Sequence, residues 1–372
     1  MAFTVSSVFR QRSDIFDFNL KFLFYLGLWP NDDWSKEKKW IYNIYGNTLL
    51  IFFFIYITMT GIGAYMYRDD AIVVLNNLDK KIVAYNFFLK TLLFYVKRDR
   101  IKNLVDEILY SGDKVADDRK KLMAYHIIVI CGLSTAAIGG FQIVALINGE
   151  LVVDAWFPFD PTKSRFTLFT ASQILGVFFM PCLYRGISIQ GIVCSIIMYV
   201  CDQLVELQNR LKALYYTVET DSFMRAEFKK IIKKHIRLVG YSKYLKETFK
   251  EYFLIQNLAV TAELCLNALM VIGLQKMKVL VTFTAFLLVA LLNAYIFCYL
   301  GNELMDQSFG VASAAYESTW TSWPVDMQKD LLIVITAAQR SFKLSAGGIA
   351  YMSMQTFAEQ LHYRIRAILY NM

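Results

Sequence analysis

The sequence predicts an all-α integral membrane protein with seven transmembrane helices, a cytoplasmic N-terminus and an extracellular C-terminus. The first observation is composition: the 372 residues are 56% hydrophobic and only 19% charged, with a mean hydropathy of +0.40. Soluble chains are about half apolar and a quarter charged. The second is a series of long uncharged runs, and the third is the gathering of Lys and Arg in alternate loops. We expect helices 4–6 to extend into a cytoplasmic layer.

Seven stretches satisfy the requirement of about 20 mostly apolar residues for a membrane-spanning helix. The second carries Asp79, Lys80, Lys81 and Lys90, and the last becomes mixed from Glu359, so these two satisfy the requirement least well. The predicted spans are 41–67, 71–96, 122–147, 166–184 with an extension to 201, 252–275, 279–302 and 344–372.

The distribution of basic residues sets the predicted orientation. Lys and Arg number 28 in one alternate set of loops and 7 in the other, and the richer set belongs in the cytoplasm. The N-terminus is therefore cytoplasmic. A G-protein-coupled receptor also has seven spans but has the opposite orientation, so this bias argues against that class. The net charge of +8 lies in these loops and needs no nucleic acid partner.

Residue types that carry chemistry are sparse. The first 40 residues lack the sustained apolar region of a signal peptide. The six cysteines fall in or beside apolar runs without a CxxC pair, and the three histidines are far apart in sequence, so we expect no metal site and no cofactor. An enzyme is the weakest hypothesis. Charges inside predicted spans, namely Lys81, Arg185 and Glu263, are expected to pair or to face water.

The loops after the fourth and sixth spans have helical periodicity. Leu204, Leu207, Leu211 and Leu214 recur at spacings of 3, 4 and 3, and a break follows at residues 220–221. From 279 to 317 no proline interrupts the pattern, which predicts a helix of roughly 58 Å that ends before residues 320–324. A short helix over 325–341 follows. We expect the regions 202–253 and 301–343 to be cytoplasmic helical anchors within a single seven-helix domain, 1–372.

The same region contains several recognisable motifs. The sequence reads CYLGNEL over 298–304 and VASAAYESTW over 311–320, followed by DLL at 330–332, AQR at 338–340 and KLSAG at 343–347. IKKHIRL occurs at 232–238. Together these motifs resemble the insect odorant receptor family, of the divergent, odour-tuned kind. A gustatory-type channel of the same superfamily is the alternative.

The resemblance implies an odorant-gated, non-selective cation channel subunit in the plasma membrane. It implies a heterotetramer with a shared co-receptor, in which the cytoplasmic helical layer holds the subunits together. The subunit anchor residues would be Tyr316, Trp320, Leu331, Leu332 and Ile335. Packing within one chain is the alternative for this layer.

The last span, 344–372, lines the central pore in this family. Leu361, Ile365, Ile368 and Met372 form an apolar stripe suited to a hydrophobic gate. The stripe is equally suited to packing on a neighbouring span.

A small volatile ligand is expected in the outer half of the bundle, where apolar and aromatic residues meet a few polar groups. Ordinary helix packing is the alternative for each residue. The candidate ligand-binding residues are Ile82, Tyr85, Asn86, Ser134, Ala137, Ile138, Phe141, Gln173, Val177, Phe178, Tyr184, Phe283, Phe286 and Leu287.

A secondary transporter is disfavoured because the sequence lacks mirrored pairs of broken apolar segments. The channel hypothesis therefore leads, with the lipid bilayer, the co-receptor and a volatile ligand as its partners.

Overall fold

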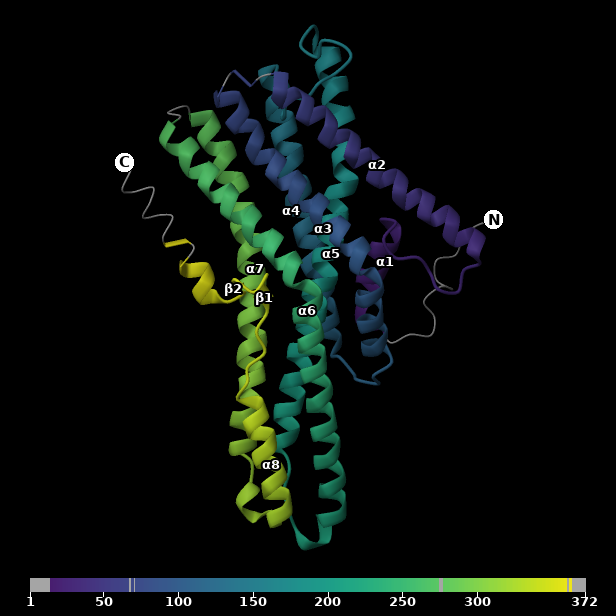
Figure 1. Cartoon of the computed structure of the whole chain (residues 1–372), viewed down its shortest axis with the longest axis vertical. Coiled ribbons are helices and arrows are strands. Elements are labelled where there is room, and N and C mark those ends of the chain that lie inside the picture. The colour runs from purple at the N-terminus through teal and green to yellow at the C-terminus, as the bar shows by residue number, and fades with distance from the viewer. Residues whose placement is uncertain (1–13, 67, 70, 274–276, 360, 363–372) are drawn as a thin grey trace.

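The computed structural model describes residues 14–66, 68–69, 71–273, 277–359 and 361–362. They form an elongated bundle of long helices (Figure 1). The helices are α1 (Asp17–Tyr25), α2 (Lys36–Met66), α3 (Ala71–Leu109), α4 (Asp117–Asn148), α5 (Arg165–Lys212), α6 (Asp221–Gly273), α7 (Met277–Tyr316) and α8 (Val325–Ala338). The strands β1 (Ser345–Ala346) and β2 (Ala350–Tyr351) follow.

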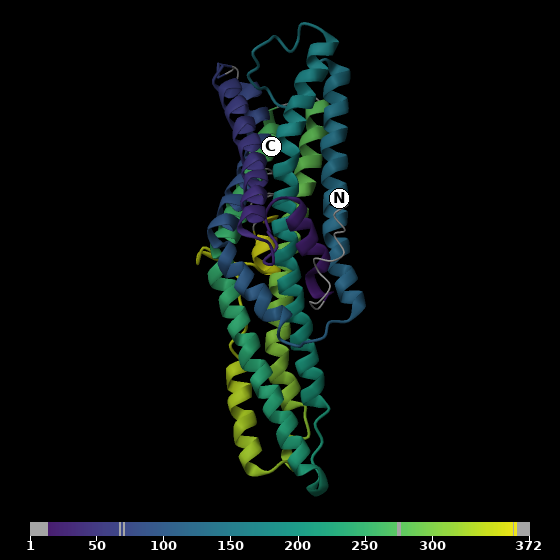
Figure 2. The same ribbon diagram turned by 90° about the vertical axis from the view of Figure 1, so that its right-hand side faces the viewer.

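Consecutive long helices run in alternate directions along the bundle (Figure 1). In the described part of the chain, α2, α4 and α5 are long and apolar enough to cross a membrane. Helices α5, α6 and α7 have 48, 53 and 40 residues, about twice what a bilayer requires. Their lower parts and α8 extend beyond α2, α3 and α4 in both views (Figures 1 and 2). The fourth, fifth and sixth predicted spans correspond to α5, α6 and α7, so the predicted extension of helices 4–6 is confirmed.

The predicted end of the long sixth span and the start of the short helix after it are confirmed, whereas the break predicted at 220–221 is the end of a longer interruption that begins after Lys212. Helix α5 ends at Lys212 and α6 begins at Asp221. Helix α7 continues without a break to Tyr316, and Pro324 caps the start of α8. Because Pro lacks a backbone N–H and disfavours helical angles in the residue before it, it separates the two helices.

The last predicted span begins differently from the expectation of a helix from residue 344. Residues 345–351 form a two-stranded antiparallel hairpin, and helix begins only at Met354. Gly347 and Gly348 have φ of 63° and 81°, which favours glycine and reverses the chain. The Gly347 N–H donates to the Lys250 carbonyl at 2.9 Å, so the hairpin is attached to α6.

A buried arginine connects four helices near the middle of the molecule. Arg185 on α5 is 1% exposed. Its Nε donates to the Leu26 carbonyl at 2.8 Å, and its Nη2 donates to the Gly46 carbonyl at 2.8 Å and the Tyr95 hydroxyl at 3.2 Å. Arg185 thus attaches the end of α1, α2 and α3 to α5, and α1 packs against α5 at mid-height (Figure 2). The expectation of a paired charge is confirmed.

A second charged cluster holds the α3–α4 loop on the cytoplasmic side. Asp113 accepts hydrogen bonds from Tyr199 on α5 at 2.7 Å and from Arg237 on α6 at 2.7 and 2.8 Å, and Lys234 lies 3.4 Å away. Burial by itself raises the pKa of Asp113. The hydrogen bond from Tyr199 and the two cations outweigh burial and hold this pKa below its usual value. The loop is therefore fixed to both extended helices.

We expect Arg185→Met to lower the free energy of unfolding by about 3 kcal/mol, because it leaves the carbonyls of Leu26 and Gly46 unpaired in a buried site. The melting temperature of detergent-solubilised protein measures the change. Arg210→Met, on the same helix, is the control: Arg210 forms a half-exposed pair with Glu206, and its loss costs less than about 1 kcal/mol. Equal melting temperatures for the two variants would contradict this role for Arg185.

Candidate ligand-binding site

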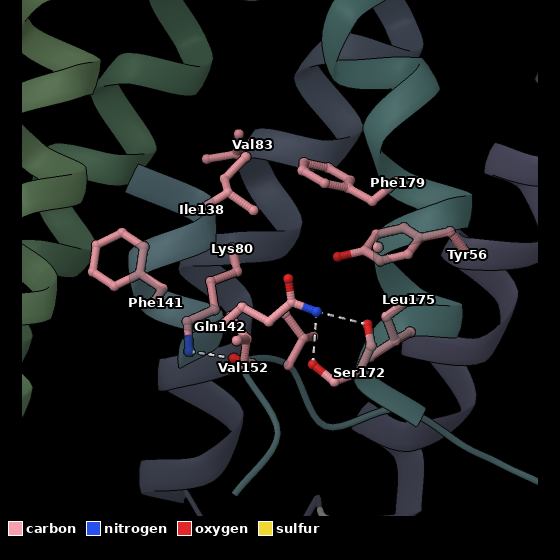
Figure 3. A pocket seen from close by; sticks show the side chains of 12 residues that line it. Tyr56, Lys80, Val83, Ile138, Phe141, Gln142, Val152, Ser172, Leu175 and Phe179 are labelled. Carbon is pink, nitrogen blue, oxygen red and sulfur yellow. Dashed lines mark hydrogen bonds between the residues drawn. The ribbon is translucent and has the colours of Figure 1, made fainter. Parts of the chain in front are cut away.

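An apolar cavity of about 90 Å³ lies between α2, α3, α4 and α5 in the outer half of the bundle. Figure 3 shows its lining, with Tyr56 and Phe179 on one side and Phe141 and Ile138 facing them. We call it the outer cavity. It is lined by Tyr56, Lys80, Val83, Ile138, Phe141, Gln142, Val152, Val153, Ser172, Leu175, Gly176 and Phe179.

Polar groups in the outer cavity are mostly paired with the protein. Gln142 Nε2 on α4 donates to both the carbonyl and the hydroxyl of Ser172 on α5, at 3.1 and 2.9 Å (Figure 3). The rings of Tyr56 and Phe179 are 5.1 Å apart. Because Gly176 has no side chain, nothing at this position separates the two rings from Gln142. The Nε2 of Gln142 is the atom outside α5 that a side chain at position 176 would meet. The cavity therefore presents aromatic and aliphatic surface to a ligand.

The segment 149–164 covers the outer end of this cavity and is attached to α3. Lys80 Nζ donates to the Val152 carbonyl at 2.6 Å (Figure 3). Asn77 donates to the Asp154 carboxylate at 2.7 Å and accepts from the Asp154 N–H at 3.0 Å. Two-way pairing of this kind fixes the backbone of the segment at Asp154.

The same segment is attached to α2. The Trp156 N–H donates to the carbonyl of Met59 on α2 at 2.9 Å. Any side chain at position 63 would collide with the backbone of Ala155, so Gly63 permits the close approach. Segment 149–164 therefore packs over the outer end of the cavity, and we call this segment the lid.

A second cavity, of about 60 Å³, lies deeper in the bundle and is more polar. We call it the inner cavity. Asn86, Gln190, Gln256 and Glu263 are all at least nine-tenths buried there. Gln190 Nε2 donates to Asn293 Oδ1 at 3.0 Å. Its lining residues are Val83, Asn86, Phe87, Ile130, Ser134, Ala137, Ile138, Leu183, Ile187, Gln190, Gln256, Glu263, Val289 and Asn293.

Five of the residues predicted for ligand binding line these cavities. Asn86, Ser134 and Ala137 line the inner cavity, Phe141 lines the outer cavity, and Ile138 lines both. On α4, which is the third predicted span, the prediction therefore identified the face that points towards the cavities.

The residues predicted on α5 do not line either cavity. Gln173 and Val177 are exposed on the outer surface of the bundle, Val177 by 58%. The Phe178 ring packs 5.4 Å from Phe52, and the Tyr184 hydroxyl pairs with Thr135 at 3.0 Å. The lining face is instead Ser172, Leu175, Gly176, Phe179 and Leu183. One residue turns a helix by 100°, and hydropathy alone does not distinguish the two faces.

The remaining predicted ligand residues lie elsewhere. Ile82 is partly buried and Tyr85 is 39% exposed, and neither lines a cavity. The side chains of Phe283, Phe286 and Leu287 lie outside the described part of the structure.

Sequence reasoning missed the contribution of α2 and of the lid. Tyr56 of α2 is one of the three aromatic residues that line the outer cavity. Val152 and Val153 belong to a loop whose position no periodicity predicts. Lys80 within the second predicted span was the available signal, because a charge at that depth requires a partner.

The predicted gate and anchor residues lie outside the cavities. Of the stripe, Leu361 is partly buried, and Ile365, Ile368 and Met372 lie outside the described residues. Of the anchor set, Leu331 is buried within its own chain, Trp320 and Ile335 are partly buried, and Tyr316 and Leu332 are 71% and 64% exposed.

Comparisons with known proteins agree with this architecture. A family model described as 7tm Odorant receptor matches residues 72–362. Odorant receptor 30a of Drosophila melanogaster is 23% identical over 323 residues, which cover 81% of this chain and 83% of that protein. The odorant receptor coreceptor of Aedes aegypti is 25% identical over 146 residues, 39% of this chain and 30% of that protein.

A solved structure has the same fold. The insect olfactory receptor OR5 from Machilis hrabei, in complex with eugenol, superposes with a TM-score of 0.76 at 16% identity, covering 96% of this chain and 97% of that one. The fold is thus that of a multi-pass α-helical membrane protein, which confirms the predicted fold class. With the family match, the chain belongs to the insect odorant receptor family.

We expect Asp154→Ala to loosen the lid, because it removes the carboxylate that accepts from Asn77. Amide hydrogen exchange over 149–164 should become at least tenfold faster, since the loss of about 1.4 kcal/mol of local stability is a tenfold change. Asp160→Ala is the control, because Asp160 accepts only from Thr162 within the same turn. Unchanged exchange in Asp154→Ala would show that other contacts hold the lid.

Proposed function

We propose that this protein is an odorant-gated cation channel subunit that binds a small volatile in the outer cavity and works in a heterotetramer with the co-receptor. The observation that carries the proposal is the outer cavity itself, an aromatic, apolar chamber within a membrane bundle and under a packed lid. Its proposed location is the plasma membrane, in the dendrites of olfactory neurons by family resemblance.

The chemistry of the outer cavity supports a small, apolar ligand. Transfer of apolar surface out of water is favourable by roughly 25 cal/mol per Å², and the cavity offers little polar competition because Gln142 and Ser172 already pair with each other. A volatile partitions into the bilayer before it binds. A concave site lined by aromatic residues and a few polar groups is typical of small-molecule recognition.

Contacts between α7 and the last helix support a route from ligand to pore. Val289 and Asn293 of α7 line the inner cavity. Two residues after Asn293, the Tyr295 ring packs edge-on against Phe357 at 5.9 Å. Movement of α7 at the cavity therefore acts directly on the helix that begins at Met354. In the proposal this helix continues into the pore, with Leu361, Ile365, Ile368 and Met372 as the gate.

The exposed face of α8 supports assembly through the cytoplasmic layer. Met327, Leu331 and Val334 pack inside the chain, while Leu332 and Ile333 are 64% and 68% exposed. Exposed, neighbouring aliphatic residues outside the membrane favour burial against another protein. We assign this face to the contact with neighbouring subunits of the tetramer, including the co-receptor.

Gly176→Trp should abolish odour-evoked current, because an indole at this position fills the space between Tyr56, Phe179 and Gln142. The measurement is voltage clamp of cells that express the chain with the co-receptor, during application of a panel of volatiles. Val177→Trp is the matched control: it adds the same side chain one residue away on the exposed surface, and its currents should equal those of the unmodified chain.

Three outcomes of that recording would contradict the proposal. The absence of current with every volatile would overturn the channel function. A second-messenger response without current would favour a receptor coupled to G proteins. Equal loss of current in both tryptophan variants, with both present at the cell surface at normal levels, would show that the ligand does not bind in the outer cavity.

Leu332→Glu should reduce co-purification with the co-receptor at least tenfold, because a charge in a desolvated contact costs more than about 1.4 kcal/mol. Val96→Glu on α3 is the control, since Val96 is an aliphatic residue that is 81% exposed and lies outside the anchor regions 202–253 and 301–343. Retention of the complex in Leu332→Glu, or equal loss in both variants, would exclude a specific contact through α8.

A further inference from the structure

The inner cavity lies directly beneath the outer cavity, and the two share a boundary. Val83 on α3 and Ile138 on α4 line both. On α5 the outer lining ends at Phe179, and the inner lining begins at Leu183, one turn deeper. Two aliphatic side chains therefore stand between an apolar chamber and a polar one.

Asn86 places an unpaired hydrogen-bonding atom in the inner cavity. The side chain is 8% exposed, and its Oδ1 has no hydrogen-bond partner among the described residues. A buried amide oxygen without a partner is unfavourable, so a ligand that donates a hydrogen bond to it is favoured. Val83 and Asn86 are three residues apart and hence on the same face of α3. A ligand that extends past Val83 from the outer cavity therefore reaches Asn86.

Charge in the inner cavity favours a neutral ligand. Of the two buried ionisable side chains Lys90 and Glu263, only Glu263 lines the cavity, and it already interacts with another group. Lys90 is engaged next to the cavity: its Nζ donates to the lining residue Gln256 and lies 4.8 Å from the centre of the Tyr252 ring. A charged ligand would therefore enter hydrocarbon without a free counter-ion among the described lining residues. Protonated amines and carboxylates are thereby disfavoured.

Resting on the proposed function, we infer that the ligand class is neutral alcohols, with the hydrocarbon in the outer cavity and the hydroxyl hydrogen-bonded to Asn86 in the inner cavity. An aldehyde, ester or ether only accepts hydrogen bonds and leaves Oδ1 unsatisfied. A hydroxyl both donates and accepts, so it pairs with the amide in either of its orientations. Val83 and Ile138 then surround the carbon next to the hydroxyl.

The test uses the full chain with the co-receptor and matched ligands of equal carbon skeleton. The panel consists of linear C4–C10 primary alcohols, benzyl alcohol and 2-phenylethanol, each with its aldehyde and its methyl ether. The most potent alcohol should have a half-maximal concentration at least tenfold below that of its methyl ether, the factor for one hydrogen bond of about 1.4 kcal/mol. This comparison on the unmodified chain does not depend on any variant folding.

Asn86→Leu should remove the preference by raising the half-maximal concentration of the alcohol about tenfold while that of the ether stays within about twofold. Gln173→Leu is the control, because Gln173 is an exposed amide on the outer surface of α5, and it should keep the preference. Asn86→Gln keeps an amide at this position and should retain part of the preference for the alcohol.

Equal potency of alcohols and ethers on the unmodified chain would overturn the inference, as would an equal shift of both in Asn86→Leu. If other volatiles evoke current but no alcohol does, the inference fails and the proposed function stands. If no volatile evokes current, the proposed function fails as well.

Discussion

The architecture depends on the pairing of one buried guanidinium with backbone carbonyls. Inside a membrane an unpaired charge or carbonyl is costly, because no water replaces the missing partner. Arg185 satisfies the carbonyls of Leu26 and Gly46 and contacts Tyr95. Helices α1, α2 and α3 are thus fixed to α5 at mid-height. The outer cavity lies above this point, the lining of the inner cavity extends along α5 from Leu183 to Gln190 on both sides of it, and the cytoplasmic layer lies further below.

Most of the fold could be predicted because it follows from local patterns. The break at 220–221, the stop before Val325 and the length of α7 come from charge, proline and periodicity, although the sequence did not show that α5 already ends at Lys212. The hairpin at 345–351 escaped prediction for a physical reason: its residues are as apolar and small as those of a helix. The backbone reversal is determined by Gly347 and Gly348 and by a tertiary hydrogen bond to Lys250.

The candidate site was predicted on α4 and partly on α3, but not on α5. Ser134, Ala137, Ile138 and Phe141 lie at helical spacing on the one face of α4 that the cavities meet. In contrast, α5 is apolar on nearly all sides in its outer half, so its sequence does not indicate which of its faces points towards the cavities. Residues such as Gly176 are identified as lining only after α2 and the lid are in place.

The separation between cavities and cytoplasmic layer has a consequence for divergence. Every residue that lines either cavity lies outside the regions 202–253 and 301–343. Substitutions at distant, independent sites add with little coupling. Under the proposed function, selectivity for a new odorant can therefore change by exchange of a few lining residues, while the proposed subunit surfaces stay intact. One unchanged assembly layer is in this way compatible with many different ligands.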